Sequence, residues 1–414
     1  MRDRRAGIAL PAIDTVGPMT AAFDLPALTA DEVAHSERLA ARIAATITRA
    51  GGFLPFAQFM RMALYEPGLG YYSAGARKFG ASGDFVTAPE VAPVFSRCLA
   101  VQCEQALREL GPDAGVLELG AGSGAMACEL LLELERRGAL PKVYSILDVS
   151  ADLRERQREA ILAAGPHLLG RVRWLDGLPG EPFDGIVLAN EVLDALVVDR
   201  FVVRGDRVMA LGVELDASGG RLQSAERPAS RELELAVRGL ESELGRALPE
   251  GYASEMNLGL AGWLRSITAT VCRGVLLFID YGLPRREYYA AERSRGTLLC
   301  HFRHRFHEDE LARVGLQDIT AWVDFTAVAE AAQAAGLDVA GYTTQAHFLI
   351  GCGLEDFVAN VAGLDLVERV NLSRQAMMLT LPGEMGERFK VIALTKAYDA
   401  PLRGFAVRDL RHTL

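Results

Sequence analysis

The sequence predicts an α/β fold with a Rossmann-like parallel sheet, a helical N-terminal addition and an inserted β-meander. Short apolar runs alternate with amphipathic helical stretches over residues 116–190, which is typical of parallel strands covered by helices on both faces. A glycine-rich turn at 120–124 separates the first run from a helical stretch. The strand pattern returns at 274–282, so the sheet is expected to continue after an insertion.

Composition narrows the class of protein. The chain has 414 residues, which predicts one large elaborated domain or two domains. Its net charge of −10 disfavours nucleic acid as a partner and is compatible with a cationic substrate. Six scattered cysteines without a CxxC pair disfavour disulfides and zinc. No apolar run is long enough to span a membrane, and no signal core follows the N-terminus, so we expect a cytoplasmic protein without membrane insertion.

The N-terminal region is predicted to be helical. Residues 1–30 are expected to form a loose tail. Within 31–110, helical spacing and the stop at Gly51-Gly52 predict helices at 31–50, 55–64 and 94–110. The segment between the last two is rich in Gly, Ser and Pro and contains GDFVTAPE. A loop of that length is usually functional or disordered, and we expect an ordered, functional loop.

The core is predicted in two pieces, 111–200 and 273–398, separated by an insertion at 201–272. The insertion contains strand-like runs joined by GD and SGG turns, followed by helical stretches at 229–245 and 259–272. The core pieces are expected to contain strands at 116–119, 143–149, 172–175, 185–190, 274–282, 337–345 and 389–396, and helices at 125–138, 151–165 and 325–336.

The glycine loop predicts a cofactor site. Gly120, Gly122 and Gly124 lie between a strand and a helix, where glycine permits a sharp turn and the helix start offers free N–H groups. A dinucleotide places its pyrophosphate there, whereas S-adenosylmethionine places its methionine part and ribose there. The spacing with Ala125 also fits the dinucleotide fingerprint, so a nicotinamide-dependent oxidoreductase remains an alternative.

Three acids accompany the loop. Glu118 precedes the first glycine by two residues, where methyltransferases use an acid to organise the loop. Asp148 closes the second strand and can accept bonds from ribose hydroxyls of either cofactor; its alternative is to cap the next helix, for which Ser150 is better placed. Asp176 follows the third strand and is a candidate for the adenine amino group, or a simple turn residue.

The ends of the fourth and fifth strands supply the candidate acceptor site. Asn190, Glu191 and Asp194 lie in NEVLDAL, at the sheet edge where open α/β folds bind ligands. No Asn/Asp-Pro-Pro-aromatic tetrad stands there, which disfavours a nucleobase substrate. Asp280 ends the fifth strand and is either a third acid of this site or a turn residue before Gly282.

Several motifs together resemble one family. GYYSAGARKFGASGDFVTAPE, LELGAGSG, ANEVLDAL, FIDYG, LQDITAWVDF, TTQAHFL and PGEMGERFKVIAL occur in the order seen in the MidA-like family, over residues 35–398. The resemblance implies a seven-stranded class I methyltransferase fold that uses S-adenosyl-L-methionine. The sequence is also similar to the mitochondrial complex I assembly factor that methylates a protein arginine. This implies a protein substrate such as a complex I subunit, and a homodimer is one option for the assembly.

The resemblance also assigns residues. The family's cofactor loop falls on Gly120, Gly122 and Gly124, its second-strand acid on Asp148, and its acid after the fourth strand on Glu191. Its GDF segment falls on Gly83, Asp84 and Phe85, and we expect Asp84 and Thr87 to contact the cofactor. LVVDRF at 196–201 departs from the family pattern of Leu-Pro-Val followed by a basic residue or histidine, which weakens the transfer of substrate details.

An arginine acceptor would need carboxylates, because its guanidinium is always charged and poorly nucleophilic. Glu191, Asp194 and Asp280 are the candidates for holding it and taking its proton. The alternatives are a non-catalytic assembly chaperone with a cofactor-binding fold and a small-molecule methyltransferase. His301, His304 and His307 could place two rings on one helical face, but the intervening arginines disfavour a metal site and favour a substrate-channel or structural role.

Overall fold

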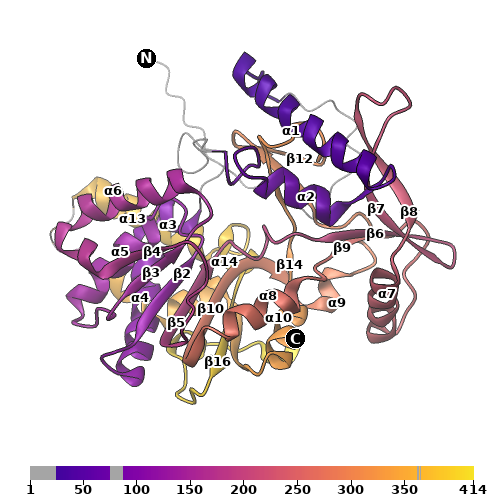
Figure 1. Ribbon diagram of the computed structural model, residues 1–414. Helices are drawn as coiled ribbons and strands as arrows, with labels where there is room; N and C mark the ends of the chain where they lie inside the picture. Colours follow the sequence, from indigo (N-terminus) through magenta and orange to yellow (C-terminus); the bar gives the residue numbers. More distant parts are fainter. Residues whose placement is uncertain (1–24, 75–86, 361–362, 364) are drawn as a thin grey trace.

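A seven-stranded mixed sheet forms the centre of the molecule (Figure 1). The computed structural model describes residues 25–74, 87–360, 363 and 365–414. The strand order is β15-β16-β10-β5-β2-β3-β4; the five strands from β10 to β4 are parallel, and β16 runs antiparallel between β10 and β15. The strands are β2 (Gly115–Leu119), β3 (Tyr144–Leu147), β4 (Val172–Leu175), β5 (Phe183–Asn190), β10 (Val271–Leu283), β15 (Asp338–Thr344) and β16 (Phe389–Lys396).

Helices cover both faces of this sheet because side chains alternate along the buried strands. Val116 and Ile186 pack on one side with α4, α5, α6 and α11, whereas Leu117 and Val187 pack on the other with α8 and α10. The expected Rossmann-like α/β fold is therefore confirmed. The helices are α4 (Pro93–Leu110), α5 (Ala125–Arg136), α6 (Ala151–Ala164), α8 (Leu260–Thr268), α10 (Phe325–Ala334) and α11 (Gln345–Gly351).

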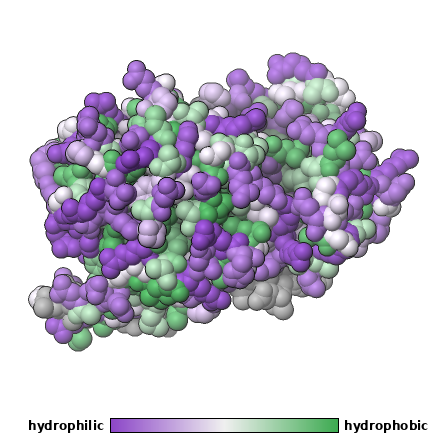
Figure 2. All heavy atoms as spheres, turned by 90° about the horizontal axis from the view of Figure 1, so that it is seen from below, coloured by the Kyte–Doolittle hydropathy of each residue, from purple (hydrophilic) through white to green (hydrophobic). Residues whose placement is uncertain are grey.

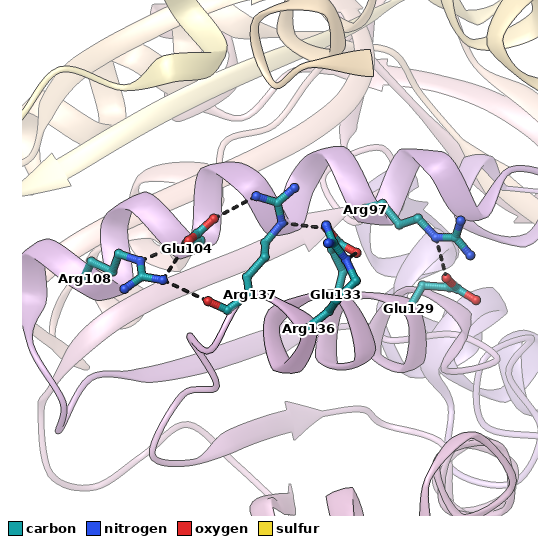
Figure 3. Close-up of polar contacts among 7 residues, drawn as sticks. All are labelled: Arg97, Glu104, Arg108, Glu129, Glu133, Arg136 and Arg137. Carbon is teal, nitrogen blue, oxygen red and sulfur yellow. Dashed lines mark hydrogen bonds and ion pairs between the residues drawn. The ribbon is translucent and has the colours of Figure 1, made fainter. Parts of the chain in front are cut away.

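Ion pairs hold α5, which follows the glycine loop, against α4 (Figure 3). Arg137 contacts Glu104 of α4 at 2.9 Å and Glu133 of α5 at 2.6 Å. Arg97 and Glu129 pair at 3.1 Å nearer the start of the two helices. Single exposed pairs contribute about 0–1 kcal/mol each, but Glu133 is largely buried and shared by two arginines. The network therefore helps to fix α5, and with it the end of the glycine loop.

The N-terminal helices and the insertion form a second packed body, at the upper right of Figure 1. α1 (Ala30–Arg49) begins with a capping box between Thr29 and Glu32 and ends before Gly51 and Gly52, which both have positive φ. α2 (Phe56–Tyr65) follows the short strand β1 (Leu54–Pro55). The predicted tail mostly falls on residues 1–24, which lie outside the described residues.

The insertion contains the expected antiparallel meander. β6 (Asp199–Arg204), β7 (Arg207–Leu215) and β8 (Leu222–Pro228) pair in sequence, and β1 joins the edge of β7. A further strand, β9 (Ala253–Met256), pairs with β6 and was not predicted from the sequence. α7 (Arg231–Leu244) packs on this sheet, whereas α8 packs on the core sheet.

A three-stranded sheet that the sequence did not predict follows β10 in the chain, before α10. It consists of β11 (Leu299–Phe302), β12 (Arg305–His307) and β13 (Asp318–Thr320), in the order β12-β11-β13. Cys300 and Ile319 pack with Leu39 of α1. The helical face considered for two of the histidines does not form, because His301 and His307 lie on the hairpin of β11 and β12.

The remaining described elements are short, apart from one exposed helix. In α13 (Leu366–Thr380), Leu379 is the only residue that is fully buried. Seen from below, the surface is largely hydrophilic with scattered hydrophobic patches (Figure 2). Within the described ranges, no helix has the length and apolarity needed to cross a bilayer. The short elements are α3 (Ala88–Val91), α9 (Arg285–Tyr288), α12 (Leu354–Ala359), α14 (Met385–Arg388) and β14 (Val323–Asp324).

Candidate active site

The glycine loop turns in a way that only glycine adopts easily. Gly120, Gly122 and Gly124 have φ values of 64°, 54° and 86°, in the left-handed region where a side chain is strained. Gly124 is also the N-cap of α5, and a Cβ there would lie 3.1 Å from Cα of Gln157. The turn therefore favours glycine at all three positions, and the close approach of α6 adds a second reason at Gly124.

Gln157 connects the loop to the acid at the end of β3. Its amide Nε2 donates to the carbonyl of Gly122 and to Oδ2 of Asp148, both at 2.9 Å. Asp148 also accepts the N–H of Ser150 at 3.0 Å, and Ser150 itself caps α6 by accepting from Leu153. Asp148 is thus held in a fixed orientation rather than serving as the helix cap. The sequence analysis missed Gln157, because a glutamine inside a helix carries no motif.

A cavity of about 1670 Å³ opens at the carboxyl ends of the central strands. Typical ligand pockets measure about 300–1,000 Å³, so this one can hold a cofactor and part of a second reactant. Gly124 lies beside this lining at the start of α5, and Gly83 and Asp84 lie outside the described residues. The cofactor candidates that border the cavity are Thr87, Glu118, Gly120, Gly122, Asp148 and Asn190.

Asp176 is not brought to this cavity. Its side chain is 94% exposed and pairs with Arg154 of α6 at 2.5 Å. Arg154 in turn donates to the backbone carbonyl of Asp148 at 3.0 Å. The position fits the turn-residue alternative better than a contact with adenine.

The buried acceptors fit a cofactor that carries amino and hydroxyl groups. Glu118 accepts the Tyr144 hydroxyl at 2.6 Å through Oε2, and burial raises the pKa of its carboxyl to about 7. Its Oε1 and the Oδ1 of Asn190 are buried and have no hydrogen-bond partner among the described residues. Buried polar atoms normally have partners, so these two oxygens are suited to accept donors from a bound molecule.

Glu191 lies where β5 ends and is held in a strained conformation. Its φ of 53° is unusual for a residue other than glycine, and its N–H donates to the carbonyl of Ile279 at 2.9 Å. Such strain is concentrated at functional sites. Burial, and then the charge of Asp194, raise the pKa of the Glu191 carboxyl to about 8. Glu191 is half-buried on the wall of the cavity, and its pKa is shifted close to neutral pH.

Asp194 borders the same cavity, three residues further along the loop. Its Oδ2 accepts the Tyr281 hydroxyl, and its Oδ1 is buried with no partner in the part of the chain that the structure describes. Burial raises the pKa of this carboxyl to about 6. The structure therefore brings Glu191 and Asp194 to one wall, as the sequence analysis expected.

Asp280, the third candidate acid, does not border the cavity. Its Oδ2 accepts the N–H groups of Leu193 and Asp194 at 2.9 and 3.2 Å, and its Oδ1 accepts the N–H of Tyr281. These bonds fix the loop that carries Asp194. The geometry supports a positioning role for Asp280.

Side chains outside the predicted set complete the cavity. They come from α2 and its following turn, from the three-stranded sheet and from α13. No group of three or more His, Cys, Asp or Glu in the described ranges is arranged to hold a metal ion. The aromatic and charged members that the sequence analysis did not assign include Tyr65, Tyr72, Tyr281, Arg305, Asp318, Trp322, Arg374 and Arg388.

Comparison with known proteins gives one consistent result. Residues 98–343 match the family model described as "Putative S-adenosyl-L-methionine-dependent methyltransferase". The chain is similar to a crystal structure from Burkholderia thailandensis bound to S-adenosyl-homocysteine, with 42% identity, a TM-score of 0.89, and coverage of 94% of this chain and 100% of that chain. A second structure from that organism, of the native protein, is also 42% identical, with a TM-score of 0.86 and the same coverage.

More distant relatives have named activities. The chain is 26% identical over 390 residues to "Protein arginine methyltransferase NDUFAF7 homolog, mitochondrial" from Drosophila melanogaster, which covers 87% of this chain and 84% of the relative. It is 27% identical over 387 residues to "Protein arginine methyltransferase NDUFAF7, mitochondrial" from Danio rerio, with 86% of each chain covered. The similarity thus extends over most of this chain and most of each relative.

Proposed function

Because the chain belongs to the MidA-like family of S-adenosyl-L-methionine-dependent methyltransferases, we propose that its methyl acceptor is an arginine side chain of a protein. The observation that carries this proposal is the pair of acids with raised pKa values, Glu191 and Asp194, on the wall of a cavity larger than one ligand needs. The distant relatives named as protein arginine methyltransferases support the same acceptor. The family resemblance supports a complex I subunit as the substrate.

The residues around the glycine loop, which form the cofactor half of the cavity, would bind and orient S-adenosylmethionine. The glycine loop presents backbone to the methionine part, Asp148 is positioned for the ribose, and Glu118 and Asn190 offer unpaired acceptor oxygens. When bound, the cofactor supplies a methyl group on a positively charged sulfur. Alignment of the two reactants can contribute about 7–11 kcal/mol to lowering the barrier.

The acids that follow β5, in the acceptor half of the cavity, would hold the positively charged substrate and take its proton. Transfer forms the bond between the guanidinium nitrogen and the methyl carbon and breaks the sulfur–carbon bond, and the nitrogen loses one proton. The pKa of the Glu191 carboxyl is raised to about 8, so its deprotonated form is a stronger base than an ordinary carboxylate and is suited to take that proton. Asp194, fixed by the Tyr281 hydroxyl, would hold the cation in the orientation that transfer requires.

Mass spectrometry of arginine methylation in cells with and without this protein tests the proposal. We expect at least one protein to lose methylarginine when the gene is absent and to regain it with the wild-type chain but not with Glu191→Gln. Unchanged arginine methylation would contradict the arginine assignment and point to a small-molecule acceptor. Full cellular function with Glu191→Gln would instead favour a non-catalytic assembly role.

A further inference from the structure

The acceptor half of the cavity contains a further acid, which is buried and comes from a distant part of the chain. Asp318, the first residue of β13, is 1% exposed and borders the cavity. Its Oδ1 accepts the N–H of Ile319, and its Oδ2 accepts the Tyr72 hydroxyl, both at 2.9 Å. Three residues further on, the N–H of Ala321 donates to the carbonyl of Asp194 at 3.0 Å. The three-stranded sheet is therefore attached to the loop that carries the proposed acceptor acids.

Aromatic side chains stand beside both acids. Tyr65 and Tyr72 stack with ring centroids 5.4 Å apart and an interplanar angle of 20°. Burial, and then the charges of Asp318 and Asp194, raise the pKa of both hydroxyls, so both acids lie within electrostatic range of this pair. Trp322 meets Tyr281 edge-on at 6.4 Å, and all of these rings border the cavity. Aromatic faces and carboxylates are the groups that proteins use to hold organic cations.

The charge of the lining also favours a cation. In addition to Asp194 and Asp318, the cavity is bordered by Glu90, Glu118, Glu191 and Glu384. Arg305, Arg374 and Arg388 border it too, on β12, α13 and α14. The buried Oδ1 of Asp194 has no partner among the described residues, so the compartment offers an unused acceptor.

We infer that Asp318 is a specificity-determining residue of the acceptor site, where its carboxylate and that of Asp194 hold a guanidinium group between walls formed by Tyr65, Tyr72 and Trp322. This inference rests on the proposed function and names the side chains that select the substrate. The Tyr72 hydroxyl orients the Asp318 carboxylate. A site that holds a substrate through buried polar groups rejects an analogue that leaves those groups unpaired.

Calorimetric titration of the full-length protein saturated with S-adenosyl-homocysteine tests this inference. The probes are the Nα-acetyl amides of arginine, of citrulline, which has the same shape without the charge, and of lysine. We expect arginine amide to bind at least about 10-fold more tightly than citrulline amide. Asp318→Asn should weaken arginine amide binding by about 10- to 100-fold, as expected for removing one partner of a buried charge pair.

Two further variants separate recognition from folding. Tyr72→Phe keeps both acids and removes the hydrogen bond that the hydroxyl donates to the Asp318 carboxylate, so arginine amide binding should weaken by about 2- to 10-fold. Asp309→Asn changes an exposed acid between β12 and β13 that does not border the cavity. This variant should bind arginine amide like the wild type. Affinity for S-adenosyl-homocysteine should change by less than about twofold in all three variants.

The possible results lead to distinct conclusions. Equal binding of arginine and citrulline amides, no binding up to about 10 mM, or unchanged arginine binding in Asp318→Asn overturns the inference. If Asp318→Asn also loses the cofactor product, Tyr72→Phe decides, and unchanged arginine binding there overturns it. Lysine amide binding as tightly as arginine amide, with the same dependence on Asp318, supports the cation site but contradicts the arginine assignment of the proposed function.

Discussion

The two halves of the cavity are built in different ways. The cofactor half comes mainly from one continuous stretch, from Glu118 to Asp148, in which a strand, a turn and a helix follow each other. The acceptor half combines α2, the loop after β5, β13 and α13, which are far apart in the sequence. A local motif can specify the first, whereas the second exists only after folding. The halves should therefore respond independently to substitution, including at Glu191, where they meet.

Glu191→Gln should have the largest effect. The amide cannot accept the proton, so we expect kcat/KM to fall by about 10²–10⁴-fold, with affinity for S-adenosyl-homocysteine changed by less than about threefold. Steady-state methylation assays and calorimetry measure the two quantities. Glu181→Gln, at an exposed position before β5, is the matched control and should keep full activity.

A large loss of cofactor affinity in Glu191→Gln would contradict the separation of the two halves. It would mean that the strained backbone at residue 191, with φ at 53°, depends on the carboxylate. The hydrogen bond from the Glu191 N–H to the carbonyl of Ile279 involves no side-chain atom and should hold the backbone in both forms.

The pH dependence should follow the same residue. Burial and the charge of Asp194 raise the pKa of Glu191 to about 8, so its carboxyl is protonated, and unable to act as a base, below that pH. kcat/KM, which reports the free enzyme, should rise about tenfold per pH unit up to a midpoint near 8 and then level off. Between pH 6 and 8 the change is about 50-fold, because only half of the carboxyl is deprotonated at pH 8. A rate that falls with rising pH over this interval, or an identical profile in Glu191→Gln, would contradict the assignment.

A substitution in the glycine loop should affect the cofactor half alone. Gly124→Ala places a Cβ 3.1 Å from Cα of Gln157 at a φ of 86°, which disturbs the residue that connects Gly122 to Asp148. We expect affinity for S-adenosyl-homocysteine to fall by about 10-fold, since strain of this kind costs about 1–2 kcal/mol.

Gly138→Ala is the control for strain without crowding. Gly138 also has a positive φ, of 64°, but a Cβ there has no neighbour within 4 Å. It should lower the free energy of unfolding without weakening cofactor binding. Equal losses of affinity in both variants would show that strain, rather than the contact with Gln157, governs the loop.

The sequence predicts more of the cofactor half than of the acceptor half for the same physical reason. Gly120, Gly122 and Asp148 were identified because their spacing is set by one strand–turn–helix unit. Tyr72 and Asp318 are 246 residues apart and meet through a side-chain hydrogen bond, so no periodicity or spacing joins them. Asp280 looked like a third acid of the site because it ends a parallel strand, but its oxygens accept backbone N–H groups.

The smallest effect is expected at Asp176, where the sequence offered a cofactor contact. Its exposed carboxylate pairs with Arg154 outside the cavity lining, and exposed pairs contribute little. Asp176→Asn should therefore change affinity for S-adenosyl-homocysteine by less than about twofold. Asp148→Asn, which alters a buried carboxylate in the lining, should weaken it by about 10-fold or more. Because Arg154 also donates to the backbone of Asp148, comparable losses in both variants would extend the cofactor half to this surface pair.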